Sequence, residues 1–187
     1  MDNTQMKQVL DEIMTHLLDG EVWHRRSAAE CRKWCVRGWG RWHDAEASCD
    51  DKYVAELTKM IGDIPTLHHT SNATVSHDAL TYEMPAANSP EEFLTNFKGH
   101  HDTWREREKR FIATLNKAIK MACEFDTALY QKLLCLKKEV ENEAFRVQLV
   151  LGRMWLTKWA DIGFVSQVLH EYFECKYDGG AIDFNIG

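Results

Sequence analysis

The sequence predicts an all-α protein, with a helical-bundle domain over residues 1–175 and a tail over 176–187. Two observations support this fold class, and a third shows that the chain can form one domain with a real core. The 187-residue chain contains only 10 Gly and 3 Pro, so residues that interrupt regular structure are scarce. Apolar residues recur every three or four positions along several long stretches, which is the period of an amphipathic helix. A chain of this length also buries enough surface for a substantial core.

The first helix is predicted over about residues 4–37, and Gly38 and Gly40 end it. Its apolar positions fall on one helical face: Met6, Leu10, Ile13, Leu17, Ala28, Cys31 and Cys35. The same stripe passes through Glu21 and His24. This first helix therefore carries two polar side chains on a face that should be buried.

The second helix is predicted over about residues 42–62, and Pro65 ends it. Asp50 lies in register with its apolar face, which consists of Ala47, Val54, Leu57 and Ile61. Residues 65–89 show no sustained period and form a connector that is long for a compact domain. A parallel step between two helices explains this length, because the chain must cross the whole bundle.

The third helix is predicted over about residues 90–123. Ser89 is a suitable N-cap, and Pro90 takes the first helical position. Its apolar face consists of Phe93, Phe97, Trp104, Phe111, Leu115, Ala118 and Ala122. His101 and Glu108 lie on the same stripe, so Glu108 is expected to point inward.

The fourth helix is predicted over about residues 127–158, with Asp126 as its cap. Glu143 is in register with the apolar face of this helix, and Glu139 lies one turn earlier. A short fifth helix is predicted over about residues 162–174.

Composition limits the classes of partner and compartment. The net charge of −6 argues against nucleic-acid binding, which usually needs a basic face. We expect no membrane segment and no signal peptide, because no apolar run is long enough. The six cysteines lack paired motif spacing and are interpreted as reduced thiols. These features favour a cytoplasmic protein.

One acid interrupts the apolar stripe of each of the four long helices: Glu21, Asp50, Glu108 and Glu143. A carboxylate on a core-facing stripe is unfavourable unless it is paired, protonated or bound to a cation. The pattern therefore predicts a polar centre inside the bundle. His24 lies three residues after Glu21, so both side chains share a helix face and could reach one ion.

Several stretches are similar to a known family. Residues 17–21 (Leu-Leu-Asp-Gly-Glu) resemble an iron-binding segment of a first helix, and residues 62–67 (Gly-Asp-Ile-Pro-Thr-Leu) resemble the exit from a second helix. Residues 89–90 (Ser-Pro) resemble the start of a third helix, and residues 139–143 (Glu-Val-Glu-Asn-Glu) an acidic run of a fourth. Over about residues 6–155 the chain thus resembles the ferritin-like superfamily, and in parts the bacterioferritins.

This resemblance implies a four-helix bundle with a long crossover between the second and third helices. It also implies an iron cofactor, as a di-iron or mixed manganese–iron centre, in a homo-oligomer that oxidises or handles Fe(II). Together with the inward acids, it gives this expected ligand set: Glu21, His24, Asp50, Glu108, Glu139 and Glu143.

The sequence departs from the family pattern in its second and fourth helices, which lack Glu-x-x-His. The second helix carries Asp50-x-x-Tyr53, or Glu46-x-x-Cys49 in another register. The fourth carries Glu143-x-x-Arg146, and arginine cannot ligate a cation. A His-Asp dipeptide at residues 43–44 is typical of metal-dependent phosphohydrolases. The further His and Asp ligands that such an enzyme needs do not have suitable spacing here.

A metal-free ferritin-like module is the alternative function. In it the inward acids pair with basic side chains, namely Arg146, Arg110 or His24. Such a protein would act by protein–protein binding as an adaptor, inhibitor or scaffold. Trp23, Trp39 and Trp155 are its candidate interface side chains, because aromatic residues often anchor interfaces.

Overall fold

The computed structural model describes residues 3–34, 36–65, 67 and 71–156. Every regular element in these residues is an α-helix, which confirms the predicted all-α class. The predicted fifth helix, 162–174, and the predicted tail, 176–187, lie outside the described residues. None of the described helices has the length and apolar character that a membrane crossing requires.

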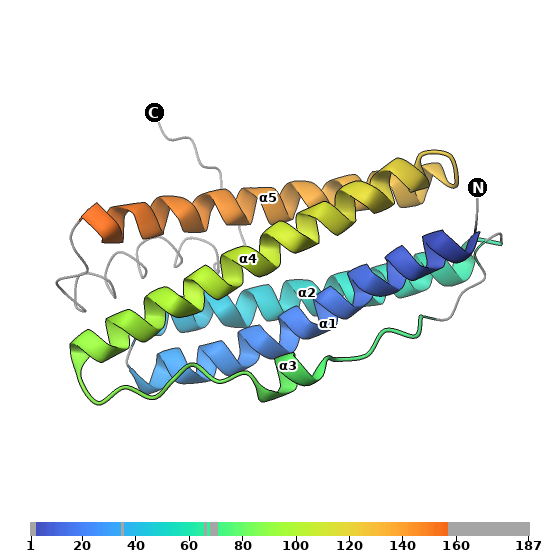
Figure 1. Ribbon diagram of the computed structural model, residues 1–187. Coiled ribbons are helices and arrows are strands. Elements are labelled where there is room, and N and C mark those ends of the chain that lie inside the picture. The colour runs from blue at the N-terminus through green and yellow to red at the C-terminus, as the bar shows by residue number, and fades with distance from the viewer. Residues whose placement is uncertain (1–2, 35, 66, 68–70, 157–187) are drawn as a thin grey trace.

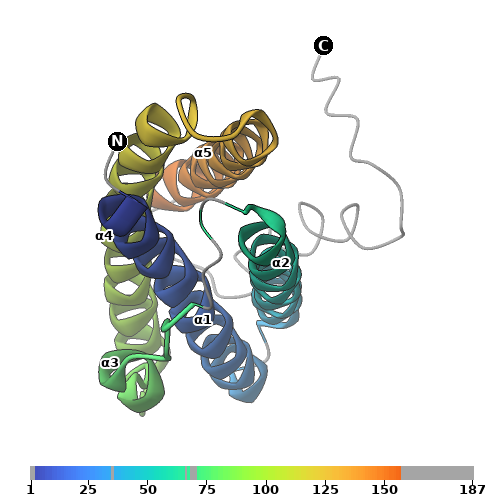
Figure 2. The ribbon, with the colours of Figure 1, turned by 90° about the vertical axis from the view of Figure 1, so that its right-hand side faces the viewer.

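Four long helices form two antiparallel pairs (Figures 1 and 2). The first pair is α1 (Asn3–Lys33) and α2 (Arg37–Asp63), and the second is α4 (Pro90–Ala122) and α5 (Thr127–Leu156). A short helix, α3 (His77–Thr81), lies in the connector between the pairs. Because this connector returns along the bundle, α2 and α4 run in the same direction (Figure 1).

The boundary between the first two helices differs from the prediction. The first ends at Lys33, before the predicted residue 37, and α2 begins at Arg37 rather than at residue 42. Gly38 and Gly40 therefore lie inside α2 and do not end the first helix. A Cβ at Gly40 would lie 3.4 Å from the carbonyl oxygen of Ala28. The first turn of α2 therefore packs directly on α1, at a distance where an added Cβ would be in van der Waals contact.

The connector is fastened along α1 by side-chain hydrogen bonds. An Asp11 oxygen, Oδ1, accepts a hydrogen bond from the Ser71 hydroxyl at 2.7 Å. Two helical turns later, Asp19 Oδ1 accepts one from the backbone N–H of Ser76 at 2.6 Å. Later residues of the connector thus bind later residues of α1, so the connector runs alongside α1 toward the start of α4.

The later part of the connector contains helical structure that the sequence analysis did not predict. Ser76 caps α3, because its hydroxyl oxygen accepts a hydrogen bond from the Ala79 N–H at 3.2 Å. Arg26 of α1 then donates from Nε to the carbonyl oxygen of Tyr82 at 2.6 Å. The connector thereby places the Tyr82 ring against the bundle.

The starts of α4 and α5 are confirmed at the residues predicted from their caps. The Ser89 hydroxyl accepts a hydrogen bond from the Glu92 N–H at 3.2 Å, and Glu92 accepts one from the Asn88 N–H at 2.7 Å. Asp126 accepts a hydrogen bond from the Leu129 N–H at 2.8 Å. Each such cap typically contributes about 1 kcal/mol.

Two apolar clusters fill the bundle. The first, here the aliphatic core, consists of Met6, Val9, Leu10, Ile13, Met14, Leu17, Tyr53, Leu57, Ile61, Ile64, Leu67, Phe111, Leu115, Ala118, Ala122, Leu129, Leu133, Leu136 and Val140. The second, here the aromatic core, consists of Trp23, Cys31, Val36, Trp39, Trp42, Met84, Phe93, Phe97, Trp104 and Val147. Full burial of one large apolar side chain contributes about 1.5–3 kcal/mol, so both cores stabilise the fold.

The aromatic core corrects one expectation. Trp23 and Trp39 are 1% and 0% exposed, so their predicted role as interface side chains is wrong. Both belong to the core because they lie on the inner faces of α1 and α2. The side chain of Trp155 lies outside the described part of the chain.

Candidate functional site

A small enclosed cavity of about 20 Å³ lies where the aliphatic and aromatic cores meet. All four long helices line it, through His16, Gly20, His24, Glu46, Asp50, Trp104, Arg107, Glu108, Phe111, Val140 and Glu143. Four of these side chains are carboxylic acids, two are imidazoles and one is a guanidinium. We call this space the central cavity.

The absence of a side chain at Gly20 makes room for Asp50. A Cβ at this position would lie only 2.4 Å from Asp50 Oδ2, which is closer than any normal contact. The first helix therefore continues through Gly20, and the Asp50 carboxyl of α2 packs against the backbone of α1 at this point. A glycine in a helix interior usually destabilises the helix by about 1 kcal/mol, so this one has a packing role.

The carboxyl of Asp50 lies in an environment that disfavours its charge. Burial raises the pKa of Asp50 well above its usual range, and the negative charges of Glu108 and Glu46 raise this pKa further. Arg107 has the opposite, smaller effect on the same pKa. The cavity therefore favours either a proton on Asp50 or an added positive charge beside it.

The structure brings four of the expected ligands to the central cavity: His24, Asp50, Glu108 and Glu143. It places the other two elsewhere. Glu21 pairs with Arg25 at 2.9 Å on the surface of α1. Its negative charge still raises the pKa of Asp50. Glu139 accepts a hydrogen bond from the Tyr53 hydroxyl and does not line the central cavity.

Two cavity residues were missing from the expected set. Glu46 lies one turn before Asp50 on α2, and only 7% of its surface is exposed. His16 lies two turns before His24; its ring stacks on Phe111 at 4.0 Å between centroids, and its Nε2 is 3.8 Å from Glu108. The spacing of four residues from a predicted ligand was the signal that could have identified Glu46.

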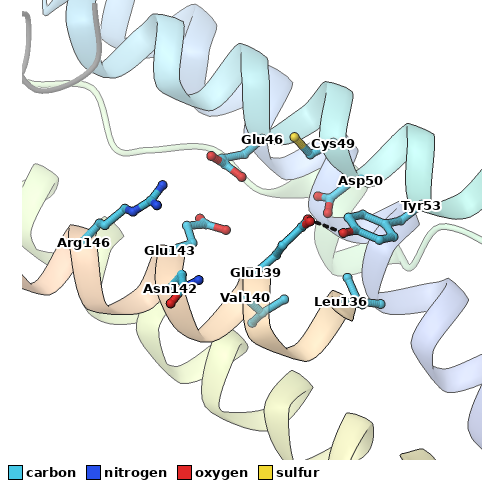
Figure 3. Close-up of a pocket in the computed structure, with 10 residues that line it drawn as sticks. All are labelled: Glu46, Cys49, Asp50, Tyr53, Leu136, Glu139, Val140, Asn142, Glu143 and Arg146. Carbon is cyan, nitrogen blue, oxygen red and sulfur yellow. Dashed lines mark hydrogen bonds between the residues drawn. The ribbon is translucent and has the colours of Figure 1, made fainter. Parts of the chain in front are cut away.

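A cleft of about 200 Å³ between α2 and α5 adjoins the central cavity (Figure 3). The two spaces share Glu46, Asp50, Val140 and Glu143 as lining residues. The hydrogen bond from the Tyr53 hydroxyl to Glu139 crosses this cleft from α2 to α5 (Figure 3). Four carboxylic acids and Arg146 line the cleft, so its potential attracts cations.

A second opening of about 410 Å³, here the outer groove, lies between α1, the connector and α4. It is lined by His16, Asp19, Trp23, Ser76, Asp78, Tyr82, Thr103, Arg107 and Arg110. Only His16 and Arg107 line both the groove and the central cavity. These two side chains therefore form the wall between an open space and an enclosed one.

A row of buried imidazoles lies beside the central cavity, within the aromatic core. His24 Nδ1 is 2.8 Å from His43 Nδ1, and His43 Nε2 is 3.2 Å from His100 Nε2. The Tyr82 hydroxyl forms a hydrogen bond with His100 Nδ1. The row thus links a tyrosine of the outer groove to a histidine of the central cavity. From the sequence, His24 was the only member of this row expected at the site, and His43 was noted only as part of the His-Asp dipeptide.

Two imidazoles of the row, those of His43 and His100, are held in their neutral form. Burial lowers the pKa of His43 and of His100 well below the usual range, and the neighbouring imidazoles add to this effect. A neutral imidazole has one N–H donor and one acceptor nitrogen. The row can therefore point in only two ways: from Tyr82 through His100 and His43 to His24, or in reverse.

The central cavity fits a cation by donor type and by enclosure. Carboxylate and imidazole ligands suit Fe(II) and Mn(II). One water-sized occupant needs about 10–15 Å³, so a volume of about 20 Å³ suits a single small ion. Among the described residues, no group of three His, Cys, Asp or Glu side chains already has the arrangement of a metal site. The ligands would have to draw together on binding.

In comparisons with known proteins, the sequence matches no profile of a protein family and no sequence among the curated proteins.

Proposed function

We propose that this protein is a ferritin-like metal protein that binds divalent iron in the central cavity and handles its oxidation. The observation that carries this proposal is the meeting of four carboxylic acids from α2, α4 and α5 with two imidazoles from α1. Like charges in a buried space repel one another, and a divalent cation would offset that repulsion. The raised pKa of Asp50 supports this argument, because it reflects a carboxyl that lacks enough positive charge beside it.

The residues that would hold the ion are the cavity acids and imidazoles: Glu46, Asp50, Glu108, Glu143, His16 and His24. Iron supplies one-electron redox chemistry toward oxygen or peroxide when it is bound. The protein supplies carboxylate oxygen and imidazole nitrogen donors, and an apolar core packs on either side of them. The small volume favours one ion per chain over the two that the family resemblance implies.

The helix arrangement also supports a ferritin-like bundle. Two antiparallel pairs are joined by a connector that follows α1, which leaves α2 and α4 parallel (Figure 1). In ferritin-like proteins, ligands project inward from facing helices at the bundle centre. The central cavity occupies the corresponding position.

Anaerobic titration with Fe(II), followed by exposure to air, tests the proposal. We expect bound iron, at about one ion per chain on the volume argument above, and a new ligand-to-metal absorption band after air is admitted. Glu108→Gln should weaken Fe(II) binding at least about tenfold, because it removes an anionic donor from the cavity. Glu106→Gln is the matched control, since Glu106 lies on the outside of the same helix and pairs with Lys109 at 2.7 Å. Absence of bound iron in the wild-type protein would show the proposal to be wrong.

A metal-free binding module is the second candidate, and two observations favour it. Arg107 already places a positive charge at the cavity, and Asp50 can be neutralised by a proton. In addition, α5 exposes large apolar side chains, among them Phe145 at 63% and Leu156 at 74% exposure. Under this function Glu108→Gln should change the free energy of unfolding and leave Fe(II) binding absent in both proteins.

A further inference from the structure

We infer that Arg107 is an internal counter-ion of the central cavity, which a bound cation displaces toward the outer groove. This inference rests on the proposed cation-binding function and adds a residue that regulates it. It assigns to Arg107 two roles of opposite sign: the guanidinium stabilises the empty protein and lowers the affinity of the cavity for metal.

The position of Arg107 makes both roles possible. It lines the central cavity together with Glu108, Asp50 and the other acids, and it also lines the outer groove together with Asp19. The carboxyls of Asp19, Glu108 and Asp50 all favour its charged form, so acids on both sides attract the same guanidinium. A small movement of this side chain therefore transfers positive charge from one space to the other.

Within the part of the chain that the structure describes, no ion pair holds the Arg107 guanidinium in place. Its Nη2 is buried and has no hydrogen-bond partner among the described residues. The guanidinium lies over the ring of Trp23, whose centroid is 5.7 Å from the guanidinium carbon. Burial lowers the pKa of Arg107 although the nearby acids oppose this effect, so the charged side chain is poorly stabilised where it lies. Such a side chain moves at a smaller energetic penalty than one held by a bidentate carboxylate.

Space determines the direction of that movement. The central cavity of about 20 Å³ holds one small ion, whereas the outer groove offers about 410 Å³. A cation in the cavity repels the guanidinium at short range. Arg107 lines the outer groove and does not line the cleft between α2 and α5, so the groove is the space into which it can move, and Asp19 is present there to receive its charge.

The test compares Arg107→Gln and Arg107→Lys with Arg110→Gln. Arg110 is the matched control, because it lines the outer groove but not the central cavity. For each protein, Fe(II) and Mn(II) affinities are measured anaerobically by calorimetry, and the stability of the metal-free form is measured by urea unfolding. Arg107→Gln should bind at least about tenfold more tightly than wild type, as expected for removal of a nearby like charge. Its metal-free form should unfold at lower urea.

The opposite signs of these two effects identify a counter-ion, since a merely structural role would lower both affinity and stability. Arg107→Lys should stay close to wild type because it keeps the charge, and Arg110→Gln should change the affinity less than about threefold. Wild-type binding with no gain in Arg107→Gln over Arg110→Gln would overturn the inference and leave the proposed function standing. Absence of binding in wild type and in Arg107→Gln would overturn both. Binding by Arg107→Gln alone would support the inference in its strongest form.

Discussion

The two halves of the bundle interior solve the problem of burial in different ways. The aliphatic core fills its half with side chains such as Leu10, Leu57 and Leu115, which need only shape and apolar surface. The aromatic core surrounds His43 and His100, which also need hydrogen-bond partners and a fixed protonation state. Stability of the first half should therefore be nearly independent of pH, whereas that of the second should depend on it. The central cavity lies at their junction, where buried charge meets both environments.

The largest expected effect is in the aliphatic core. Leu115 is fully buried, so Leu115→Ala should lower the free energy of unfolding by about 2–5 kcal/mol through lost burial and a cavity. Urea unfolding measures this loss, which should be the same at pH 7 and pH 5 because proton binding does not change. Leu134→Ala, at a position 39% exposed, should lose less than about 0.5 kcal/mol. Similar losses for both variants would contradict the proposed core.

The second prediction concerns protonation in the aromatic half. Burial lowers the pKa of His101 to about 3, whereas an unfolded histidine titrates near about 6.5. Between these values only the unfolded state binds the proton, so stability falls as pH falls, by about 1.4 kcal/mol per pH unit. His101→Phe removes this contribution and should make the stability profile between pH 6 and 4 less steep by about that amount, while His43 and His100 keep their own contributions in both proteins. The raised pKa of Asp50 acts in the opposite direction but is common to both proteins.

A control separates the buried imidazole from histidine content in general. His77 is exposed at the start of α3, so His77→Gln should leave the pH slope of unfolding unchanged. Equal slopes for wild type and His101→Phe would mean that His101 is protonated in the folded protein. The proposed difference between the two halves would then be wrong at this position.

The smallest effect is expected at the junction of the halves. In Gly20→Ala the new Cβ meets Asp50 Oδ2, so we expect a loss of about 1–3 kcal/mol despite the better helix propensity of alanine. Gly99 also lies inside a long helix, but a Cβ there meets nothing within 4 Å. Gly99→Ala should therefore gain up to about 1 kcal/mol. Thermal unfolding of the two variants should shift in opposite directions, and a gain in both would show that Asp50 can move aside.

Sequence reasoning identified what a single helix can encode. The period of three and four residues located the long helices, and the caps at Ser89 and Asp126 located the starts of α4 and α5. It missed the start of α2, because Gly38 and Gly40 resemble a helix stop unless the partner surface on α1 is known. The close packing of two helices is a tertiary property that overrides local propensity.

The candidate site was predictable only in part, for the same reason. Asp50, Glu108 and Glu143 could be found because each lies on the apolar stripe of its own helix. Arg107 and His43 could not, because their roles depend on neighbours from other helices rather than on their own stripe. Glu21 shared a stripe with His24 but pairs with Arg25 at the edge of the face.

The row from Tyr82 to His24 connects proton placement at two distant points of the molecule. When the row runs toward His24, that ring accepts at Nδ1 and carries its proton on Nε2; when it runs in reverse, Nε2 offers a lone pair. Only a lone pair can bind a cation, so an ion on His24 Nε2 selects the reversed direction. The Tyr82 oxygen then accepts from His100, and its own hydrogen turns toward the outer groove. A cation bound at His24 thus sets the direction of each hydrogen bond in the row as far as Tyr82, without displacement of a heavy atom.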